Sequence, residues 1–137
     1  MKNTLGYMGL IPFTLLPIAV LLLSDMNRGL AIYSYFAYSA GIAIFMAGTI
    51  WGRVVDDEHP SSAVLLMSNL ITLFVIVLST VSFHNFTVLS IGLLLAHGFN
   101  YLFEPNKSNL SYQKLRKILT TVVISSHCIM AAILYFN

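Results

Sequence analysis

Charged side chains are scarce in this sequence of 137 residues. They make up 9% of it, against about 25% in a typical soluble domain, whereas 58% of the residues are hydrophobic. A soluble fold of this length could not bury so much apolar surface in one core, because small domains leave a large fraction of their surface in water. The composition therefore argues against a soluble domain and predicts a protein surrounded by lipid.

Cysteine and the residue patterns of soluble enzymes are also lacking. The single cysteine, Cys128, cannot form an intrachain disulfide, and a lone cysteine in an apolar run is usually a small apolar residue. The sequence contains no phosphate-binding loop, nucleophile elbow, paired-cysteine motif or HExxH. We therefore do not expect an enzyme, a catalytic residue or a cofactor. Nucleic acid is not an expected partner either, because the basic residues lie beside apolar segments.

Long apolar runs are what the sequence has instead. About 20 residues of helix cross a hydrocarbon core about 30 Å thick, and backbone polar groups in lipid need partners within their own segment, which favours helices. Five runs are long enough, at residues 5–23, 30–51, 62–81, 86–103 and 118–136. The sequence predicts an all-α polytopic membrane bundle of five transmembrane helices, forming one integral membrane domain over residues 1–137.

The basic residues are unequally divided between the two sides of this predicted bundle. Arg28 stands alone on one side. The other side holds Lys2, Arg53, Lys107, Lys114, Arg116 and Lys117. The positive-inside rule then predicts a cytoplasmic N-terminus and a C-terminus outside. We interpret the basic residues before the last helix as anchors facing the lipid head groups, with an acidic partner as the alternative.

Three of the five acidic residues stand together between the second and third predicted helices, directly before a histidine. We expect no metal site, and the residues that come nearest to one are Asp56, Asp57, Glu58 and His59. Carboxylates with a histidine can bind divalent ions, but consecutive side chains point in different directions. The favoured interpretation is a turn in which the acids precede a helix N-terminus, where anions are stabilised, and one of the two following serines caps that helix.

Small residues line one face of the second predicted helix. They are Ala37, Ala40, Gly41, Gly48 and Gly52. Small residues let membrane helices approach closely, and the last two form a GxxxG match. We interpret this face as a helix-packing seam within the bundle, with a ligand groove as the alternative.

Polar residues form stripes on the last three predicted helices, and they supply the candidate functional residues. These intramembrane candidates are Asn69, His97, Asn100, Glu104 and His127. Polar side chains at membrane depth turn inward, so these helices should face one another. Asn69 and His97 are equally distant from their hairpin, which predicts a hydrogen bond between them. His97 and His127 differ in depth by about 9 Å at about 1.5 Å per residue, which argues against a shared haem iron.

These features leave three hypotheses open. The first is a non-enzymatic protein that acts by helix–helix contact, either as an accessory or assembly factor for a membrane-protein partner or as a small homo-oligomer. The second is a pathway for a small solute, proton or ion along the polar stripes, because ionisable groups inside a membrane are functional candidates by default. The third is a haem or quinone subunit.

Three stretches resemble one family of small membrane proteins. They are "LGYMGLIPF" at 5–13, "YSAGIAIFMAGTIWG" at 38–52 and "YQKLRKILT" at 112–120. In order and spacing they are similar to the domain of unknown function 3429 family, whose eukaryotic members are called transmembrane-protein-69-like. Ala47 and Ile50 replace a glycine and a histidine of the second motif, so no role of that histidine carries over. The resemblance implies a multi-pass protein of a bacterial inner (plasma) membrane, or of a mitochondrial membrane if the source is eukaryotic, and no biochemical activity.

Overall fold

The computed structural model describes residues 2–105 and 109–137, and its regular elements in these ranges are all helices. They are α1 (Lys2–Met8), α2 (Ile11–Leu22), α3 (Asp25–Val54), α4 (Ser62–Val81), α5 (Phe86–Leu102) and α6 (Leu110–Phe136). Four spans in the described residues are long and apolar enough to cross a bilayer, and α5 is a shorter apolar helix. The first of these spans, Thr4–Leu22, joins α1 to α2. The predicted all-α membrane bundle with five helical passes is thus confirmed.

The first predicted helix, 5–23, is broken where α1 meets α2. Pro12 lies in the first turn of α2 and has no backbone N–H to donate to the carbonyl of Met8, with which its ring would also clash in a continuous helix. The N–H of Gly9 donates to Leu5 O at 3.1 Å instead, and the N–H of Leu10 donates to Tyr7 O at 3.0 Å. Pro12 therefore interrupts the helix, although one apolar span still runs from Thr4 to Leu22.

The other boundaries differ from prediction where polar residues extend an apolar run. α4 has the predicted bounds, but α3 and α6 are longer than the runs 30–51 and 118–136. Asn109 begins α6 early because its side chain accepts the N–H of Tyr112 at 2.9 Å, as an N-cap does. The predicted serine cap before α4 is confirmed at Ser61, which accepts the N–H of Val64 at 3.5 Å. Of the basic residues counted for topology, Lys107 lies outside the described residues.

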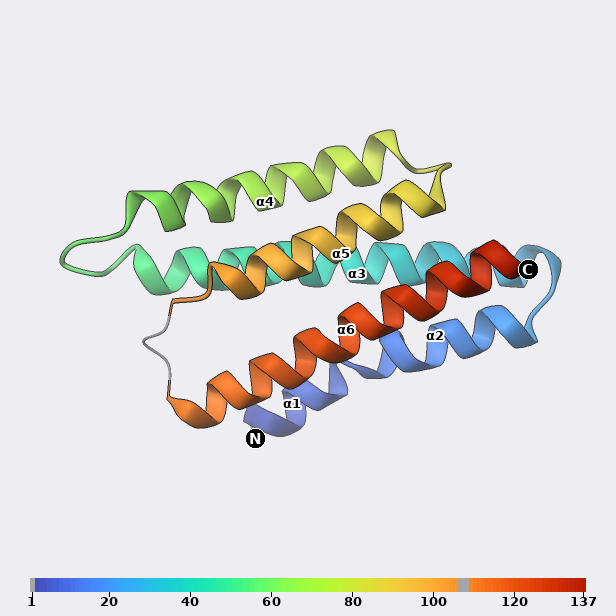
Figure 1. The fold of residues 1–137 in the computed structure, drawn as a ribbon, viewed down its shortest axis with the longest axis horizontal. Coiled ribbons are helices and arrows are strands. Elements are labelled where there is room, and N and C mark those ends of the chain that lie inside the picture. The colour runs from blue at the N-terminus through green and yellow to red at the C-terminus, as the bar shows by residue number, and fades with distance from the viewer. Residues whose placement is uncertain (1, 106–108) are drawn as a thin grey trace.

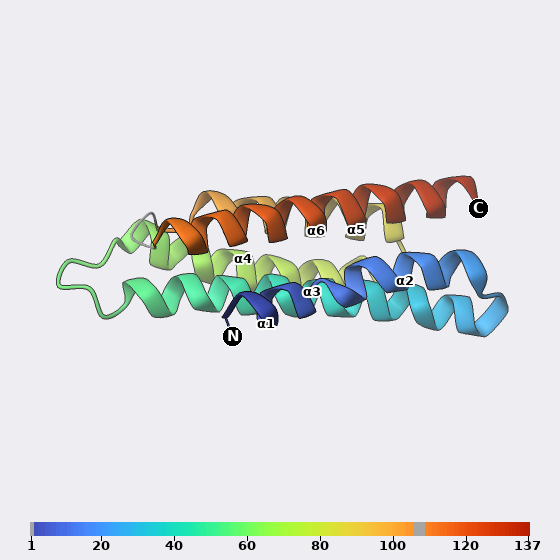
Figure 2. The same cartoon turned by 90° about the horizontal axis from the view of Figure 1, so that it is seen from below.

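α3 is the central helix of the bundle. It packs against α2, α4 and α5, while α6 packs against α1, α2 and α5. Figure 1 shows α2 and α4 on opposite sides of α3, and Figure 2 shows α5 and α6 stacked over α2 and α3. The C-terminus lies at one end of the bundle, opposite the end at which α3 and α5 finish (Figure 1).

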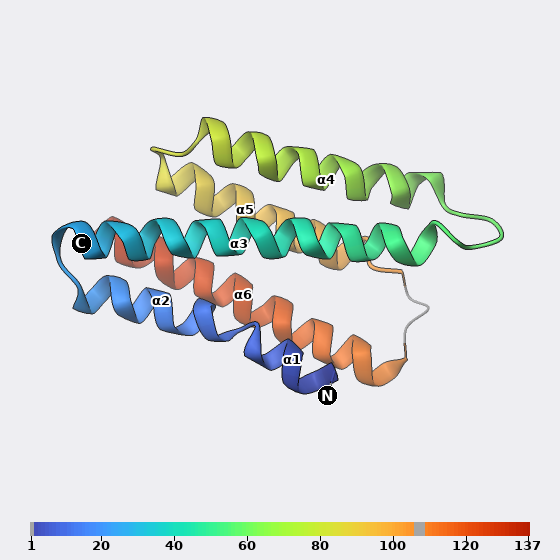
Figure 3. The ribbon, with the colours of Figure 1, turned by 180° about the vertical axis from the view of Figure 1, so that it is seen from behind.

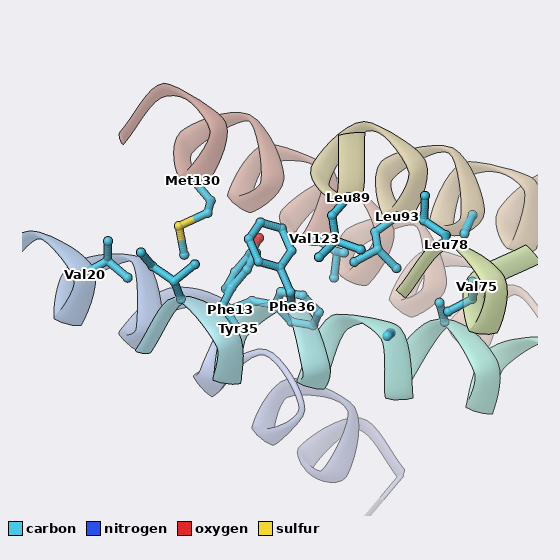
Figure 4. Packing of buried hydrophobic residues seen from close by; sticks show 14 of the residues in the cluster. Phe13, Val20, Tyr35, Phe36, Val75, Leu78, Leu89, Leu93, Val123 and Met130 are labelled. Carbon is cyan, nitrogen blue, oxygen red and sulfur yellow. The ribbon is translucent and has the colours of Figure 1, made fainter. Parts of the chain in front are cut away.

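The apolar core lies between α2, α3, α4, α5 and α6 (Figure 4). Phe13 of α2 meets Tyr35 of α3 edge-to-face, with ring centroids 5.8 Å apart, a favourable arrangement for aromatic pairs. Phe36 of α3 stacks on Phe86 of α5 at 5.6 Å. These rings join three helices beside a group of buried polar side chains.

The small-residue face predicted on α3 does not pack against the rest of this chain. Of its five members only Ala40 is buried, and a Cβ built on Gly41, Gly48 or Gly52 would have no atom within 4 Å. The predicted seam within the bundle is therefore wrong. α3 instead turns inward the face that carries Tyr35, Phe36 and Ser39, with alanines along the same face, because polar side chains at membrane depth find their partners inside the bundle. Figure 3 shows α3 in front, with α5 and α6 behind it.

The close helix approach that a glycine permits occurs on α5. A Cβ on Gly92 would lie 2.7 Å from Cδ1 of Leu78 in α4, so a larger residue there would displace the Leu78 side chain. Ala96 lies four residues after Gly92, and this small-xxx-small spacing is a local signal for a close helix contact.

Candidate functional site

Ser39 of α3 lies at the centre of a buried polar network. Its Oγ is 2.9 Å from Nε2 of His97 in α5 and 2.7 Å from Nε2 of His127 in α6, and all three side chains are buried. A serine hydroxyl has one proton, so with both imidazoles neutral it donates to one ring and accepts from the other. Three helices are thereby joined through one oxygen atom.

The two histidines meet despite their predicted difference in depth. Their ring centroids are 5.8 Å apart, although we expected about 9 Å of axial offset from about 1.5 Å per residue. Side chains lean toward the N-terminus of their own helix, and α5 and α6 run antiparallel (Figure 1). His97 therefore leans away from the connecting loop and His127 leans toward it, so the rings converge on Ser39.

A second group of buried polar side chains supplies a hydrogen bond that the backbone of α2 lacks. Pro17 inside α2 has no N–H, so the carbonyl of Phe13 lacks its usual helical partner. Ser126 of α6 donates to this carbonyl at 2.6 Å. Because that bond uses the serine proton, Tyr35 is the donor in its 3.0 Å contact with Ser126 Oγ. Pro17 thus leaves an acceptor on α2 that Ser126 of α6 bonds, and Tyr35 of α3 in turn bonds Ser126.

Serine and tyrosine were the functional residue types missed by sequence reasoning. The rule that polar side chains turn inward in a membrane was applied to the last three predicted helices only. Applied to the second, it would have pointed to Ser39 and Tyr35. Ser90 of α5 extends the network more loosely, with its Oγ 3.4 Å from Nδ1 of His127.

Asn69 does not take part in this network, so the predicted Asn69–His97 hydrogen bond is wrong. Asn69 is exposed and donates through Nδ2 to the carbonyl of Leu65 in its own helix at 3.0 Å. α4 buries the stripe that contains Ser68 and Ile71, and one residue on a helix turns the direction by about 100°. Asn69 and His97 lie at the same depth, but the rotation of α4 about its axis directs Asn69 toward the lipid.

Asn100 is buried one turn from His97 and has one amide atom without a partner. Its Nδ2 donates to the carbonyl of Ala43 in α3 at 2.9 Å, which fixes the orientation of the amide. Its Oδ1 finds no hydrogen-bond donor among the described residues, although the side chain is 1% exposed. A buried acceptor without a donor is costly and calls for an explanation.

Glu104 lies just beyond α5, at the end of the bundle, and joins two arginines. Arg53 at the end of α3 donates to Oε1, and Arg116 of α6 donates to Oε2 through Nη2 at 2.8 Å and Nε at 3.1 Å. Arg53 also stacks over the ring of Tyr112, 4.2 Å from its centroid. Arg116 is buried, so its interpretation as a lipid-facing anchor is corrected: it binds an acidic residue of its own chain.

The predicted turn between α3 and α4 gathers no metal-binding group. Asp56, Glu58 and His59 are exposed and Asp57 is half-buried. Among the described residues no three His, Cys, Asp or Glu side chains lie close enough to hold a metal ion. His97 and His127 are the nearest approach to a ligand pair, but the hydroxyl of Ser39 occupies the point between their Nε2 atoms.

Comparison with known proteins adds a family. The family model described as "Protein of unknown function (DUF3429)" matches residues 1–132. No curated protein and no solved structure gives a significant match.

Proposed function

The chain belongs to the DUF3429 family, and from that premise we propose that it acts in the membrane by helix–helix contact, as a non-enzymatic accessory or assembly factor. Its partner would be a helix of another membrane protein, or of a second copy of this chain. The observation that carries the proposal is the outward face of α3, where a Cβ added to any of three glycines would have no atom of another helix within 4 Å.

That face has the shape that membrane helices use to associate. In lipid the association of helices depends on close packing, and small residues permit it. Gly41, Gly48 and Gly52 leave the backbone of α3 accessible, and the exposed ring of Phe45 lies on the same face. Inside the chain, by contrast, the polar groups are largely bonded to one another. The bundle therefore offers a partner an accessible stretch of backbone on a helix that is already held in place.

Larger side chains on this stretch should break the contact. We expect Gly48→Leu and Gly52→Leu each to lower recovery of the partner in mild detergent by about tenfold, which corresponds to about 1.4 kcal/mol. Gly98→Leu is the matched control, since a Cβ added to Gly98 of α5 would also have no atom of another helix within 4 Å. A single cysteine in place of Gly48, in a Cys128→Ser background, should cross-link in native membranes, and mass spectrometry of the adduct distinguishes a second copy from another protein. An unchanged partner yield in both leucine variants would contradict the proposal.

A proton pathway is the second candidate, favoured by the chain of contacts from His97 through Ser39 and His127 to Ser90. Neutral imidazoles and hydroxyls in series can pass a proton by reorienting. This series of polar contacts borders apolar rings near His127, whose ring centroid lies 6.3 Å from that of Phe36. Helix–helix contact therefore remains the better-supported function.

Vesicle measurements separate the two candidates. If the network conducts, a pH gradient across proteoliposomes should decay faster than in empty vesicles, and His97→Leu with His127→Leu should abolish the difference. If the protein acts by contact, the gradient should decay equally with the unmodified chain and with this double variant.

For topology we propose a cytoplasmic N-terminus and an external C-terminus in a bacterial inner membrane, or the equivalent arrangement in mitochondria. The support is the basic side of the bundle, where Arg53, Lys114 and Lys117 lie near the ends of α3 and α6. A reporter enzyme fused after Asn137 should be active only when it requires an external location. Activity of a cytoplasm-dependent reporter at the same position would reverse the assignment.

A further inference from the structure

A cavity of about 160 Å³ opens beside the polar network. Most of its wall is apolar, from residues such as Phe13, Ile42, Met46 and Val123. Four polar residues also line it: His97, Asn100, Arg116 and Thr120. A mostly apolar cavity with a few convergent polar groups is the usual form of a small-molecule site.

The chemistry of the polar groups restricts what the cavity can accept. The unpartnered Oδ1 of Asn100 accepts hydrogen bonds and cannot donate, so a ligand must offer an O–H or N–H group to it. Arg116 is already bonded to Glu104 through Nε and Nη2. A carboxylate or phosphate would place its negative oxygens against Oδ1, so the site favours a neutral donor over an anion.

The size and the opening of the cavity restrict the ligand further. A cavity of about 150 Å³ holds one benzene ring, which matches this volume. Leu5 of α1 and Phe45 of α3 line the cavity and are themselves exposed. The cavity therefore opens between α1 and α3 onto the lipid-facing surface, and a ligand would enter sideways from the bilayer.

We propose that this cavity binds the hydroxylated ring of a neutral membrane-soluble amphiphile of the quinol or alkylphenol class. The ring hydroxyl donates to Oδ1 of Asn100, the ring lies against Phe13 and Val123, and the alkyl tail leaves between α1 and α3. His97 lines the same cavity and has Nε2 on Ser39, so an occupied cavity is linked directly to the histidine network.

The test uses the full chain in vesicles and two tritiated probes with the same decyl tail. One is a decyl-substituted 1,4-benzoquinol kept under reducing conditions, and the other is its dimethyl ether, which cannot donate a hydrogen bond. We expect saturable quinol binding above that of protein-free vesicles, and affinity for the ether lower by about tenfold or more, as the loss of a buried hydrogen bond implies.

Two neighbouring threonines of α6 provide the blocking variant and its control. Thr120 lines the cavity, so Thr120→Phe should abolish quinol binding by filling the space. Thr121 is exposed and bonds the carbonyl of Lys117 in its own helix, so Thr121→Phe should bind as the unmodified chain does. Circular dichroism and gel filtration report whether each variant folds, and if Thr120→Phe does not, the comparison of the two probes decides.

Three results would overturn the proposal. One is the absence of saturable quinol binding by the unmodified chain. Another is equal affinity for the quinol and its ether, which would mean that Asn100 is satisfied by water and that the cavity binds any apolar ring. The third is competition by dodecyl phosphate but not by unlabelled quinol, which would make the site an anionic-lipid site.

Discussion

Replacing Glu104 with glutamine should lower the free energy of unfolding by about 3 kcal/mol, because removing one partner of a buried ion pair leaves an uncompensated charge. That charge is Arg116, whose side chain is 7% exposed. The amide can still accept one of the hydrogen bonds that Oε2 now accepts, which places the loss at the low end of the usual range. Reversible unfolding in mixed micelles, followed by circular dichroism, measures the change.

A matched variant and a double variant identify the cause. Arg53→Gln removes the other partner, whose side chain is 34% exposed, and should cost less than about 1 kcal/mol, as partly exposed pairs do. Adding Arg116→Met to Glu104→Gln should recover most of the loss, because both members of the buried pair are then gone. An equal loss in Arg53→Gln and Glu104→Gln would show that burial of Arg116 is not what makes Glu104 important.

Ser39→Ala should destabilise the bundle by about 2 kcal/mol. This loss exceeds the roughly 0.6 kcal/mol measured per membrane hydrogen bond, because it includes the cost of an unsatisfied buried polar group, about 1–3 kcal/mol. The variant removes the one oxygen that both histidines contact. It leaves an Nε2 atom on each ring without its partner. The same micelle unfolding experiment measures the loss.

The control for Ser39→Ala lies on the same helix. Ser34 of α3 is exposed, so Ser34→Ala should change the free energy of unfolding by less than about 0.5 kcal/mol, as surface substitutions do. In a His97→Leu background, Ser39→Ala should cost less than it does alone, since one of its two partners is already absent. Additive losses would mean that the Ser39–His97 contact contributes nothing to stability.

The fold could be predicted largely because its determinants are local. Whether a segment spans a bilayer depends on its own length and apolarity, which is why the predicted bounds of α4 agree with the structure. The serines before an apolar run indicated where one helix begins, as Ser61 confirms. The break at Pro12 has a local cause as well, because proline has no backbone N–H to donate.

The site could be predicted only in part, because rotation of a helix about its axis depends on its neighbours. His97, Asn100 and His127 were correctly expected to turn inward, and Glu104 was expected among them but lies at the end of the bundle with two arginines. The prediction for Asn69 was wrong because depth in the membrane does not show how α4 is rotated about its axis.

The sequence alone determined that the protein is a bundle of apolar helices. Lipid requires each segment to form its backbone hydrogen bonds internally, and the hydropathy of a segment follows from its own residues. Which face of each helix turns inward was decided by tertiary structure. Five helices share one core, and the best total packing turned the aromatic face of α3 inward and left Gly41, Gly48 and Gly52 facing out. Side chains of antiparallel helices lean in opposite directions along the bundle, and because His127 starts farther from the connecting loop than His97, both rings reach Ser39.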